Sequence, residues 1–193
     1  MATTSSPTPF IPPPYTTFPP FYTLQPNHQT LTHQLDLWSS LILAYCTHHN
    51  LHKLSLSSLP PALFTSSNPT TPRSLKPADI RAVLEHMALP SNGARIEWLG
   101  GSAGGRSGGQ AESCWVWTRT PNEWADAIYG WVEETGQRSS VLTLYEIKEG
   151  EGKREWRGME EAMVRKVLGV LVKRGKAQVF QAGQGDGEGV KFF

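Results

Sequence analysis

The sequence has little cysteine, no long apolar run and no excess of charge. Its two cysteines, Cys46 and Cys114, are too few for a disulfide framework and belong to no paired-cysteine metal motif. No stretch approaches the roughly 18 consecutive apolar residues of a membrane span, and the N-terminus lacks the basic start and apolar core of a secretory signal. We therefore expect reduced thiols and a cytoplasmic protein that does not insert into membranes.

The charge balance argues against a nucleic-acid partner. The chain carries 18 basic and 17 acidic side chains, for a net charge of +1. A nucleic-acid binder normally presents a basic face, because neutralising phosphates supplies most of its affinity. The predicted helices that begin at Pro77 and near Glu160 instead mix acidic with basic side chains, which is typical of protein contacts.

Motifs for catalysis and cofactors are equally scarce. Gly100 to Ser107 has the spacing of a phosphate-binding loop, but arginine replaces the lysine, and a strand rather than a helix should follow it. Cys46 and the histidines of residues 48–52 lack the second ligand pair that zinc requires. No Ser, Cys or His stands in a recognisable nucleophile motif. We expect no enzyme, no metal and no cofactor.

What the sequence does contain is one order of elements that occurs twice. In the first half, apolar residues at helical spacing predict a helix from about Asn27, its N-cap, to His49, and a second helix from Pro77. A Ser/Thr/Pro-rich interval, Ser55 to Ser74, separates them, and the strands ARIEWL and SCWVW follow, joined by a glycine-rich loop. The helical stripes are Leu35, Trp38, Ile42 and Tyr45, then Ile80, Val83, Leu84 and Met87.

The second half repeats this order. Thr120 to Glu123 fits a capping box with proline at the first helical position. The strand VLTLY, Val141 to Tyr145, and a charged loop, Ile147 to Gly158, come next. Another helix then precedes the strands AQVF and VKFF, which flank a glycine-rich turn. The helical stripes here are Trp124, Ile128, Trp131 and Val132, then Val164, Val167, Leu168 and Leu171.

Helix, intervening element, helix and a stranded hairpin make up a winged helix, in which the hairpin is the wing. The sequence therefore predicts an α+β protein with two tandem winged-helix domains, residues 27–119 and 120–193. A proline-rich arm, residues 1–26, precedes them.

The arm contains Pro-Pro-x-Tyr twice, as PPPY and PPFY. Proline fixes φ and lacks an N–H, so we expect an extended polyproline II strand whose rings lie outside either domain core. Such strands bind aromatic-lined grooves at a small entropic cost, whereas a merely solvating tail has few aromatics. The candidate partner-binding residues are Pro12, Pro13, Tyr15, Pro19, Pro20, Phe21 and Tyr22.

Three stretches carry a resemblance that covers nearly the whole chain from about Pro12. They are PPFYTLQPN running into QLDLWSSLILAYC, then PNEWADAIYGWVEETGQRSSVLTLYEI, and the C-terminal GVKFF. Together they resemble the small-subunit family of the ESCRT-II complex. The resemblance implies tandem winged helices, a complex with two copies of this subunit, an arm that docks on the larger subunits, and peripheral recruitment to endosomal membranes.

The resemblance also implies that the second winged helix recruits the ESCRT-III subunit that starts filament assembly, in multivesicular body sorting of ubiquitinated cargo. In VLTLY, alternate residues share a face, so one leucine or valine could point outwards. We expect Leu142 to be the outward-facing residue that contacts the ESCRT-III subunit. The alternative is that both faces of the strand are buried.

Two other functions use the same features. A tandem winged-helix transcription regulator would need basic recognition helices. A WW-domain ligand or adaptor of a ubiquitin ligase would present Tyr15 and Tyr22.

Compared with the ESCRT-II family, the interval 55–74 and the wing 100–113 are longer, which affects loop contacts and not the fold.

Overall fold

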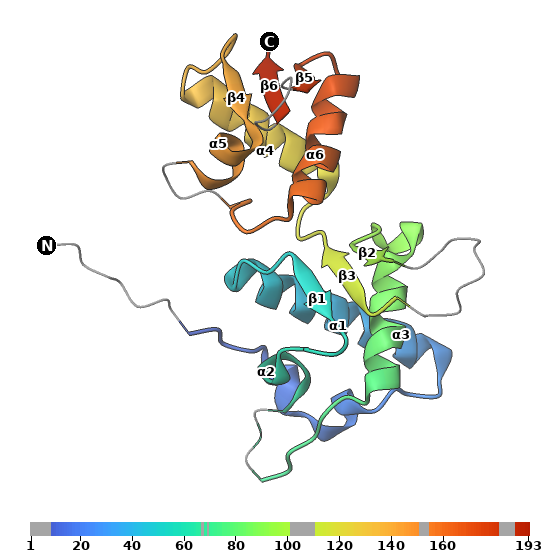
Figure 1. Cartoon of the computed structure of the whole chain (residues 1–193). Coiled ribbons are helices and arrows are strands. Elements are labelled where there is room, and N and C mark those ends of the chain that lie inside the picture. The colour runs from blue at the N-terminus through green and yellow to red at the C-terminus, as the bar shows by residue number, and fades with distance from the viewer. Residues whose placement is uncertain (1–8, 67, 69, 101–110, 151–154, 182–187) are drawn as a thin grey trace, which may run out of the picture. The chain divides into compact units, whose positions relative to one another are not determined.

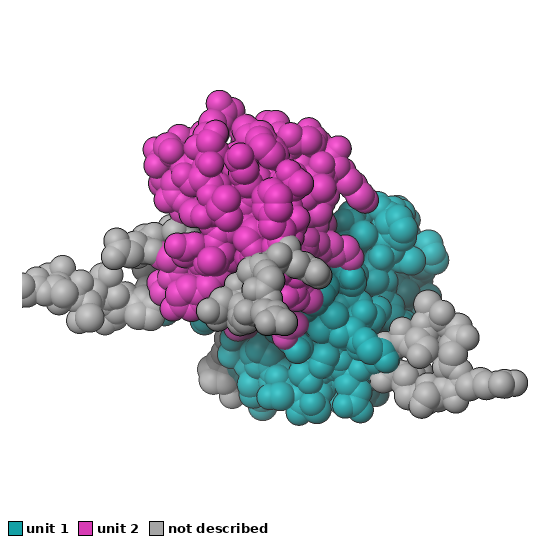
Figure 2. Space-filling model, turned by 45° about the horizontal axis from the view of Figure 1, so that its top comes forward, with its two compact units in different colours: residues 1–49, 53–115 teal, residues 50–52, 116–193 magenta. Residues whose placement is uncertain are grey.

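The computed structural model describes residues 9–66, 68, 70–100, 111–150, 155–181 and 188–193. The chain forms two compact units (Figures 1 and 2). Residues 1–49 and 53–115 make unit 1, and residues 50–52 and 116–193 make unit 2. None of the helices in the described ranges has the length and mean hydropathy that crossing a membrane requires.

Unit 1 packs helices against a small sheet (Figure 1). Its strands pair in the order β1-β3-β2, and β1 runs antiparallel to β3 with Leu54 opposite Cys114. In chain order the elements are η1 Pro14–Thr17, η2 Pro19–Tyr22, α1 His28–His48, β1 Lys53–Ser55, α2 Pro61–Phe64, α3 Pro77–Ala88, η3 Pro90–Asn92, β2 Ile96–Leu99 and β3 Ser113–Val116.

The two long helices of unit 1, which the apolar periodicity predicted, are confirmed. The Asn27 side chain accepts a hydrogen bond from the Thr30 backbone N–H over 3.1 Å, which makes it the N-cap of α1. Trp38 and Ile42 on α1 are completely buried, and Leu35 is half-buried. All four residues of the predicted α3 stripe are buried.

Strand β1 was not predicted. It is only three residues long, and Leu54 is its one buried side chain. A strand of that length offers no alternation of apolar and polar residues to detect, because the pattern needs four or more positions to stand out.

Unit 2 has its own helices and a second sheet with the strand order β4-β6-β5 (Figure 1). The capping box holds as predicted, since the Thr120 hydroxyl accepts from the Glu123 N–H while the Glu123 carboxylate accepts from the Thr120 N–H. The elements are α4 Pro121–Glu134, β4 Val141–Thr143, α5 Leu144–Glu149, α6 Glu161–Lys173, β5 Ala177–Gln181 and β6 Glu188–Phe192.

The prediction that VLTLY is one strand was wrong. The strand ends at Thr143, whose hydroxyl accepts from the Glu146 N–H over 3.1 Å, while the Glu146 carboxylate accepts from the Thr143 N–H over 2.7 Å. This second capping box begins α5 at Leu144. Apolar alternation suggested a strand, but Thr-x-x-Glu specifies a helix start within it.

The charged loop expected from Ile147 to Gly158 also needs correction. Ile147 lies in α5 and is completely buried. Its carbonyl accepts a hydrogen bond from the Trp156 indole over 2.8 Å, and Trp156 is itself 5% exposed. Apolar residues at the ends of this charged stretch therefore belong to the core of unit 2.

A short piece of chain that precedes β1 belongs to unit 2. The His52 carbonyl accepts from the Val116 N–H over 2.9 Å, and the Asn50 side chain donates to the Arg157 carbonyl. In the structure, the chain passes from unit 1 to unit 2 between Trp115 and Val116. The boundary expected from the sequence, between Arg119 and Thr120, lies slightly further along the chain.

Each unit therefore contains the helix pair and three-stranded sheet of a winged helix, and the fold is α+β. The second helices of the two pairs are α3 and α6. The central parts of both predicted wing tips, residues 101–110 and 182–187, lie outside the described residues.

Candidate protein-docking sites

The proline-rich arm is folded rather than extended. Phe18 N–H donates to the Tyr15 carbonyl over 3.2 Å, and Phe21 N–H donates to the Phe18 carbonyl over 3.0 Å. Hydrogen bonds between residues three apart define 3-10 turns, whereas polyproline II has none. The expectation of a polyproline II strand was therefore wrong for η1 and η2. A proline at the start of each turn supplies a suitable φ, and its missing N–H needs no partner there.

The aromatic residues of the second motif are buried in unit 1. Phe21 and Tyr22 are 5% and 4% exposed. Phe21 stacks on the α1 residue Trp38, with ring centroids 4.3 Å apart, and Tyr22 meets the same indole edge-on at 5.6 Å. The expectation that the tyrosine rings lie outside either core is thus wrong for Tyr22.

Polar groups from α1 fix the backbone of the second motif. Gln34, which is 6% exposed, donates to the Phe21 carbonyl over 2.8 Å and to the Thr23 carbonyl over 3.0 Å. The Trp38 indole donates to the Phe21 carbonyl over 3.2 Å. Buried carbonyls need such partners, so Gln34 and Trp38 determine where this turn lies.

The first motif is only partly buried. Tyr15 is half-buried, its hydroxyl donates to the Leu37 carbonyl over 3.3 Å, and its ring meets Phe21 edge-on at 5.1 Å. Burial raises the pKa of the Tyr15 phenol above its ordinary value of 10.0, so the phenol remains a hydrogen-bond donor at neutral pH. Of the four candidate prolines, Pro12 and Pro20 are exposed, and Pro13 and Pro19 are half-buried.

Phe18 was missed as a candidate because it belongs to neither motif. It lies between the two turns and is 62% exposed. Ile11, at 81%, is the other large exposed apolar side chain of the described arm. Exposure of an aromatic residue between buried ones has no signature in the sequence.

The long interval 55–74 contributes a strap that lies against the arm. Thr65 and Ser74 form a β-bridge at its base. The Ser66 hydroxyl donates to the Thr16 carbonyl over 3.2 Å, and the Asn68 amide donates to the Thr17 carbonyl over 3.3 Å. We use the term strap for residues 65–74, whose described side chains hold the end of η1.

Leu142 does not face outwards. It is 8% exposed, and it lies opposite Val190 in the sheet, on the side that faces the core of unit 2. Expecting it at the surface was wrong because it shares a face with Val190, which is completely buried. The neighbouring side chains Val141 and Tyr145 are 60% and 73% exposed.

A small pocket adjoins Tyr145. Its lining is mixed, with the apolar side chain of Leu144 among charged groups. Arg165 on α6 spans two acidic lining residues, donating to Glu161 over 2.6 Å and to Glu188 over 2.8 Å. The pocket is lined by Thr143, Leu144, Tyr145, Lys148, Glu161 and Glu188.

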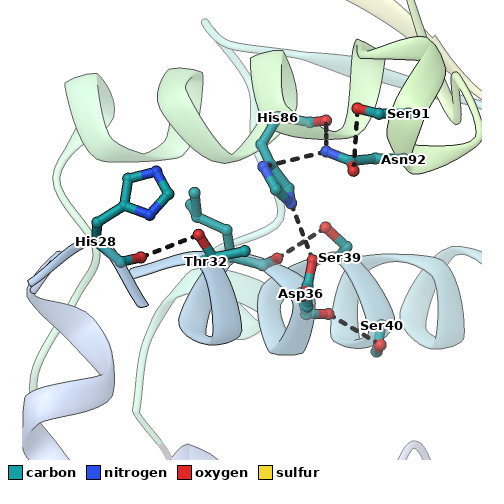
Figure 3. Close-up of polar contacts among 9 residues, drawn as sticks. His28, Thr32, Asp36, Ser39, Ser40, His86, Ser91 and Asn92 are labelled. Atoms are coloured by element: carbon teal, nitrogen blue, oxygen red, sulfur yellow. Dashed lines mark hydrogen bonds and ion pairs between the residues drawn. The ribbon is translucent and has the colours of Figure 1, made fainter. Parts of the chain in front are cut away.

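One polar cluster in unit 1 combines His, Asp and Asn (Figure 3). The His86 ring contacts Asp36 through Nε2 at 3.0 Å and the Asn92 amide through Nδ1 at 3.2 Å. Because the amide nitrogen can only donate, Nδ1 accepts and Nε2–H donates to Asp36. Both ring nitrogens of His86 therefore have hydrogen-bond partners, and neither partner is a nucleophile. The cluster links α1 to α3.

The remaining chemical candidates are buried or dispersed. Burial raises the pKa of the Cys46 and Cys114 thiols to about 12, so neither supplies a thiolate at neutral pH. Within the described ranges, no three His, Cys, Asp or Glu side chains are grouped as metal ligands would be. Most of the stretch that has the spacing of a phosphate-binding loop, residues 101–107, lies outside the described residues.

Comparisons with known proteins agree with this architecture. A family model described as ESCRT-II complex subunit matches residues 15–160. Vacuolar protein-sorting-associated protein 25 of Danio rerio is 37% identical over 179 residues, which cover 91% of this chain and 94% of that protein.

Solved structures show the same fold. The crystal structure of subunit VPS25 of the endosomal trafficking complex ESCRT-II aligns with a TM-score of 0.77 and 25% identity, covering 94% of this chain and 98% of that one. A chain of the endosomal complex ESCRT-II (VPS22/VPS25/VPS36) aligns with a TM-score of 0.73 and 24% identity, covering 94% and 98%. The relative and the solved structures cover 91% and 94% of this chain, and the chain belongs to the ESCRT-II complex subunit family.

Proposed function

We propose that this chain is a non-enzymatic subunit that joins the larger ESCRT-II subunits through its arm, with two copies in each complex. Its second winged helix recruits and activates an ESCRT-III subunit in multivesicular body sorting of ubiquitinated cargo. The solved complex named above contains VPS22 and VPS36, and relatives of these two proteins are the partners we propose. The complete complex then acts peripherally on endosomal membranes.

The folded arm is the observation that carries this proposal. The two aromatic residues of its second motif are buried in unit 1, while Ile11, Pro12, Pro14, Phe18 and Pro20 remain exposed. Exposed apolar side chains on an ordered backbone are typical of a protein interface, because little further ordering is needed on binding. We therefore assign docking to this exposed side and a supporting role to Phe21 and Tyr22.

A truncation designed on this division tests the proposal. A chain that begins at Pro19 lacks the first motif and Phe18 but retains Phe21 and Tyr22 on Trp38. It loses the buried hydrogen bond from the Tyr22 hydroxyl to the Thr16 carbonyl, so it should fold with a lower melting temperature. It should fail to co-purify with the larger subunits. A chain that begins at Pro9 retains the described arm and is the matched control. Equal recovery of the larger subunits with both truncated chains would refute docking through the arm. Replacing both tyrosines is a poorer test, because Tyr22 is a core residue.

The ESCRT-III contact is assigned to the surface around Tyr145. Val141 and Tyr145 present apolar area beside a pocket whose lining includes Lys148 and the two glutamates, Glu161 and Glu188, that Arg165 bridges. An amphipathic partner helix recognises such a place by laying its apolar face against it. The buried Leu142 supports this surface from below and makes no direct contact.

Single replacements can separate this contact from assembly. Tyr145→Ala should leave the ESCRT-II complex intact and weaken its binding to the ESCRT-III initiating subunit. Phe180→Ala, which changes another exposed aromatic residue of unit 2 at 40% exposure, is the control and should bind normally. Wild-type affinity of the Tyr145 variant would exclude this surface as the contact.

The two alternatives receive less support. A WW domain must reach the motif tyrosine, and Tyr22 is 4% exposed. A transcription regulator would need a basic recognition helix, but on α6 Arg165 is paired with Glu161 and Glu188. An enzyme with a cysteine nucleophile would need a thiolate, and the raised pKa of both thiols argues against one.

A further inference from the structure

We propose that Phe18 is the principal docking side chain of the arm, and that Gln34 and the strap hold the arm folded so that Phe18 is presented to an uncharged apolar pocket on a larger ESCRT-II subunit. The inference rests on the proposed docking function of the arm. It assigns the main contact to a residue outside both Pro-Pro-x-Tyr motifs.

The exposure of three neighbouring aromatic residues separates two roles. Phe18 is 62% exposed, whereas Phe21 and Tyr22 are 5% and 4% exposed. Aromatic residues that anchor an interface lose exposed area when the partner binds. Phe21 and Tyr22 have almost none left to lose, because Trp38 already covers them. Tyr15 is half-buried, so Phe18 is the aromatic residue of the two motifs and their junction with the most exposed area to lose.

The backbone of Phe18 is fixed on both sides. Its N–H donates to the Tyr15 carbonyl over 3.2 Å, and its carbonyl accepts from the Phe21 N–H over 3.0 Å. Phe18 is the C-cap of η1 and the N-cap of η2. The Phe18 side chain therefore projects from the joint between two turns. Because the arm is already ordered, binding loses less conformational entropy than binding of an unstructured peptide would.

Two groups outside the arm keep this joint in place. Gln34 binds the carbonyls of Phe21 and Thr23 and accepts from the Gln25 N–H over 3.1 Å, which secures the chain after Phe18. The strap binds the carbonyls of Thr16 and Thr17, which secures the chain before it. Gln34 thus acts as a positioning residue, at a distance from the contact.

The composition of the arm indicates the chemistry of its partner. No charged side chain occurs in residues 1–27, and the exposed neighbours of Phe18 include the rings of Pro14 and Pro20. An anionic membrane or a nucleic acid would require basic groups here. An uncharged pocket on a protein fits, and its affinity should depend little on salt.

The direct test measures binding of the purified full-length chain to purified larger ESCRT-II subunits. Phe18→Ala should weaken binding by about 30-fold or more, which corresponds to about 2 kcal/mol for an anchor residue. The control Thr23→Ala changes an exposed residue after the second motif and should bind normally. Raising the salt concentration should change wild-type affinity by less than about threefold, because the arm carries no charge to screen.

The positioning role of Gln34 has a different kinetic signature. Gln34→Ala should slow association and increase chymotrypsin cleavage after Tyr22, because the loosened arm must order on binding. Phe18→Ala should instead speed dissociation. If Gln34→Ala changes only the melting temperature, with wild-type association and wild-type cleavage, Gln34 is structural and this half of the inference is wrong.

The possible results separate this inference from the proposed function. If the chain that begins at Pro19 fails to bind while Phe18→Ala binds normally, the arm docks but Phe18 is not its anchor. If the chain that begins at Pro19 binds normally, docking through the arm is itself wrong. If Phe18→Ala lowers the melting temperature as much as Phe21→Ala does, Phe18 is a packing residue and the proposal fails. Loss of binding by Phe18→Ala with an unchanged melting temperature supports it.

Discussion

The ring of Phe21 lies flat on the indole of Trp38, with centroids 4.3 Å apart and planes inclined by 12°. The two residues are separated by the start of α1, so this contact joins the arm to the first winged helix. Phe64 also stacks on this indole, with ring centroids 5.9 Å apart. The aromatic residues of the second Pro-Pro-x-Tyr motif, Phe21 and Tyr22, are therefore part of the core of unit 1.

Phe21→Ala should destabilise unit 1 by about 3–5 kcal/mol, the usual cost of replacing a buried phenylalanine with alanine. Urea unfolding of the full-length chain, followed by tryptophan fluorescence, measures the change. Phe18→Ala should change the free energy of unfolding by less than about 0.5 kcal/mol, because the Phe18 ring is mostly exposed. Equal stability of the two variants would contradict the assignment of Phe21 to the core.

Thr143→Ala should cost about 1 kcal/mol, because the N-cap of α5 loses its acceptor for the Glu146 N–H. Hydrogen bonds from Thr143 lower the pKa of the Glu146 carboxyl. Their stabilisation is present above the ordinary carboxyl pKa and is lost as the pH falls through the lowered value. Hydrogen exchange of the α5 amides measures the loss. Thr135→Ala, at the end of α4, leaves this cap intact and should not affect those amides.

Unit 2 should become less stable in mild acid because of His52. Burial lowers the pKa of this imidazole below its ordinary value of 6.5. Below pH 6.5 the unfolded chain binds a proton that the folded unit does not, so the free energy of unfolding should fall until the lowered pKa is reached. His52→Phe retains a ring against Trp124 and should flatten this dependence between pH 5 and 7, measured by urea unfolding. An unchanged slope would exclude His52 as its source.

The two cysteines should be unreactive in the folded chain. Burial raises the pKa of both thiols to about 12, so almost no thiolate forms near pH 8. Ellman's reagent should modify neither thiol of the native protein and both after denaturation in urea. Rapid modification of the native chain would show that Cys46 or Cys114 is accessible.

Periodicity was enough to predict the main helices and the repeated order of elements. The stripe on α3 is an example, since all four of its predicted residues are buried. Short elements were less predictable. Strand β1 buries only Leu54, and the start of α5 lies inside an apolar alternation that also fits a strand.

The sequence identified the segments that contain the candidate sites. It did not predict which side chains in those segments are buried and which are exposed. The motifs identified the arm, but burial of Tyr22 depends on Trp38, which lies on a different element. Leu142 was assigned to the surface because local alternation says which residues share a face and not which face is buried. Pairing with Val190 decides that question, and it involves a strand near the end of the chain.

Native mass spectrometry of this chain co-expressed with the two larger ESCRT-II subunits tests the central claim most directly. The full-length chain should give one complex that contains two copies of it and one of each larger subunit. The chain that begins at Pro19 should remain monomeric and leave the larger subunits without it. A complex of the same mass composition formed by that truncated chain, or a full-length chain that stays free of both larger subunits, would contradict the account.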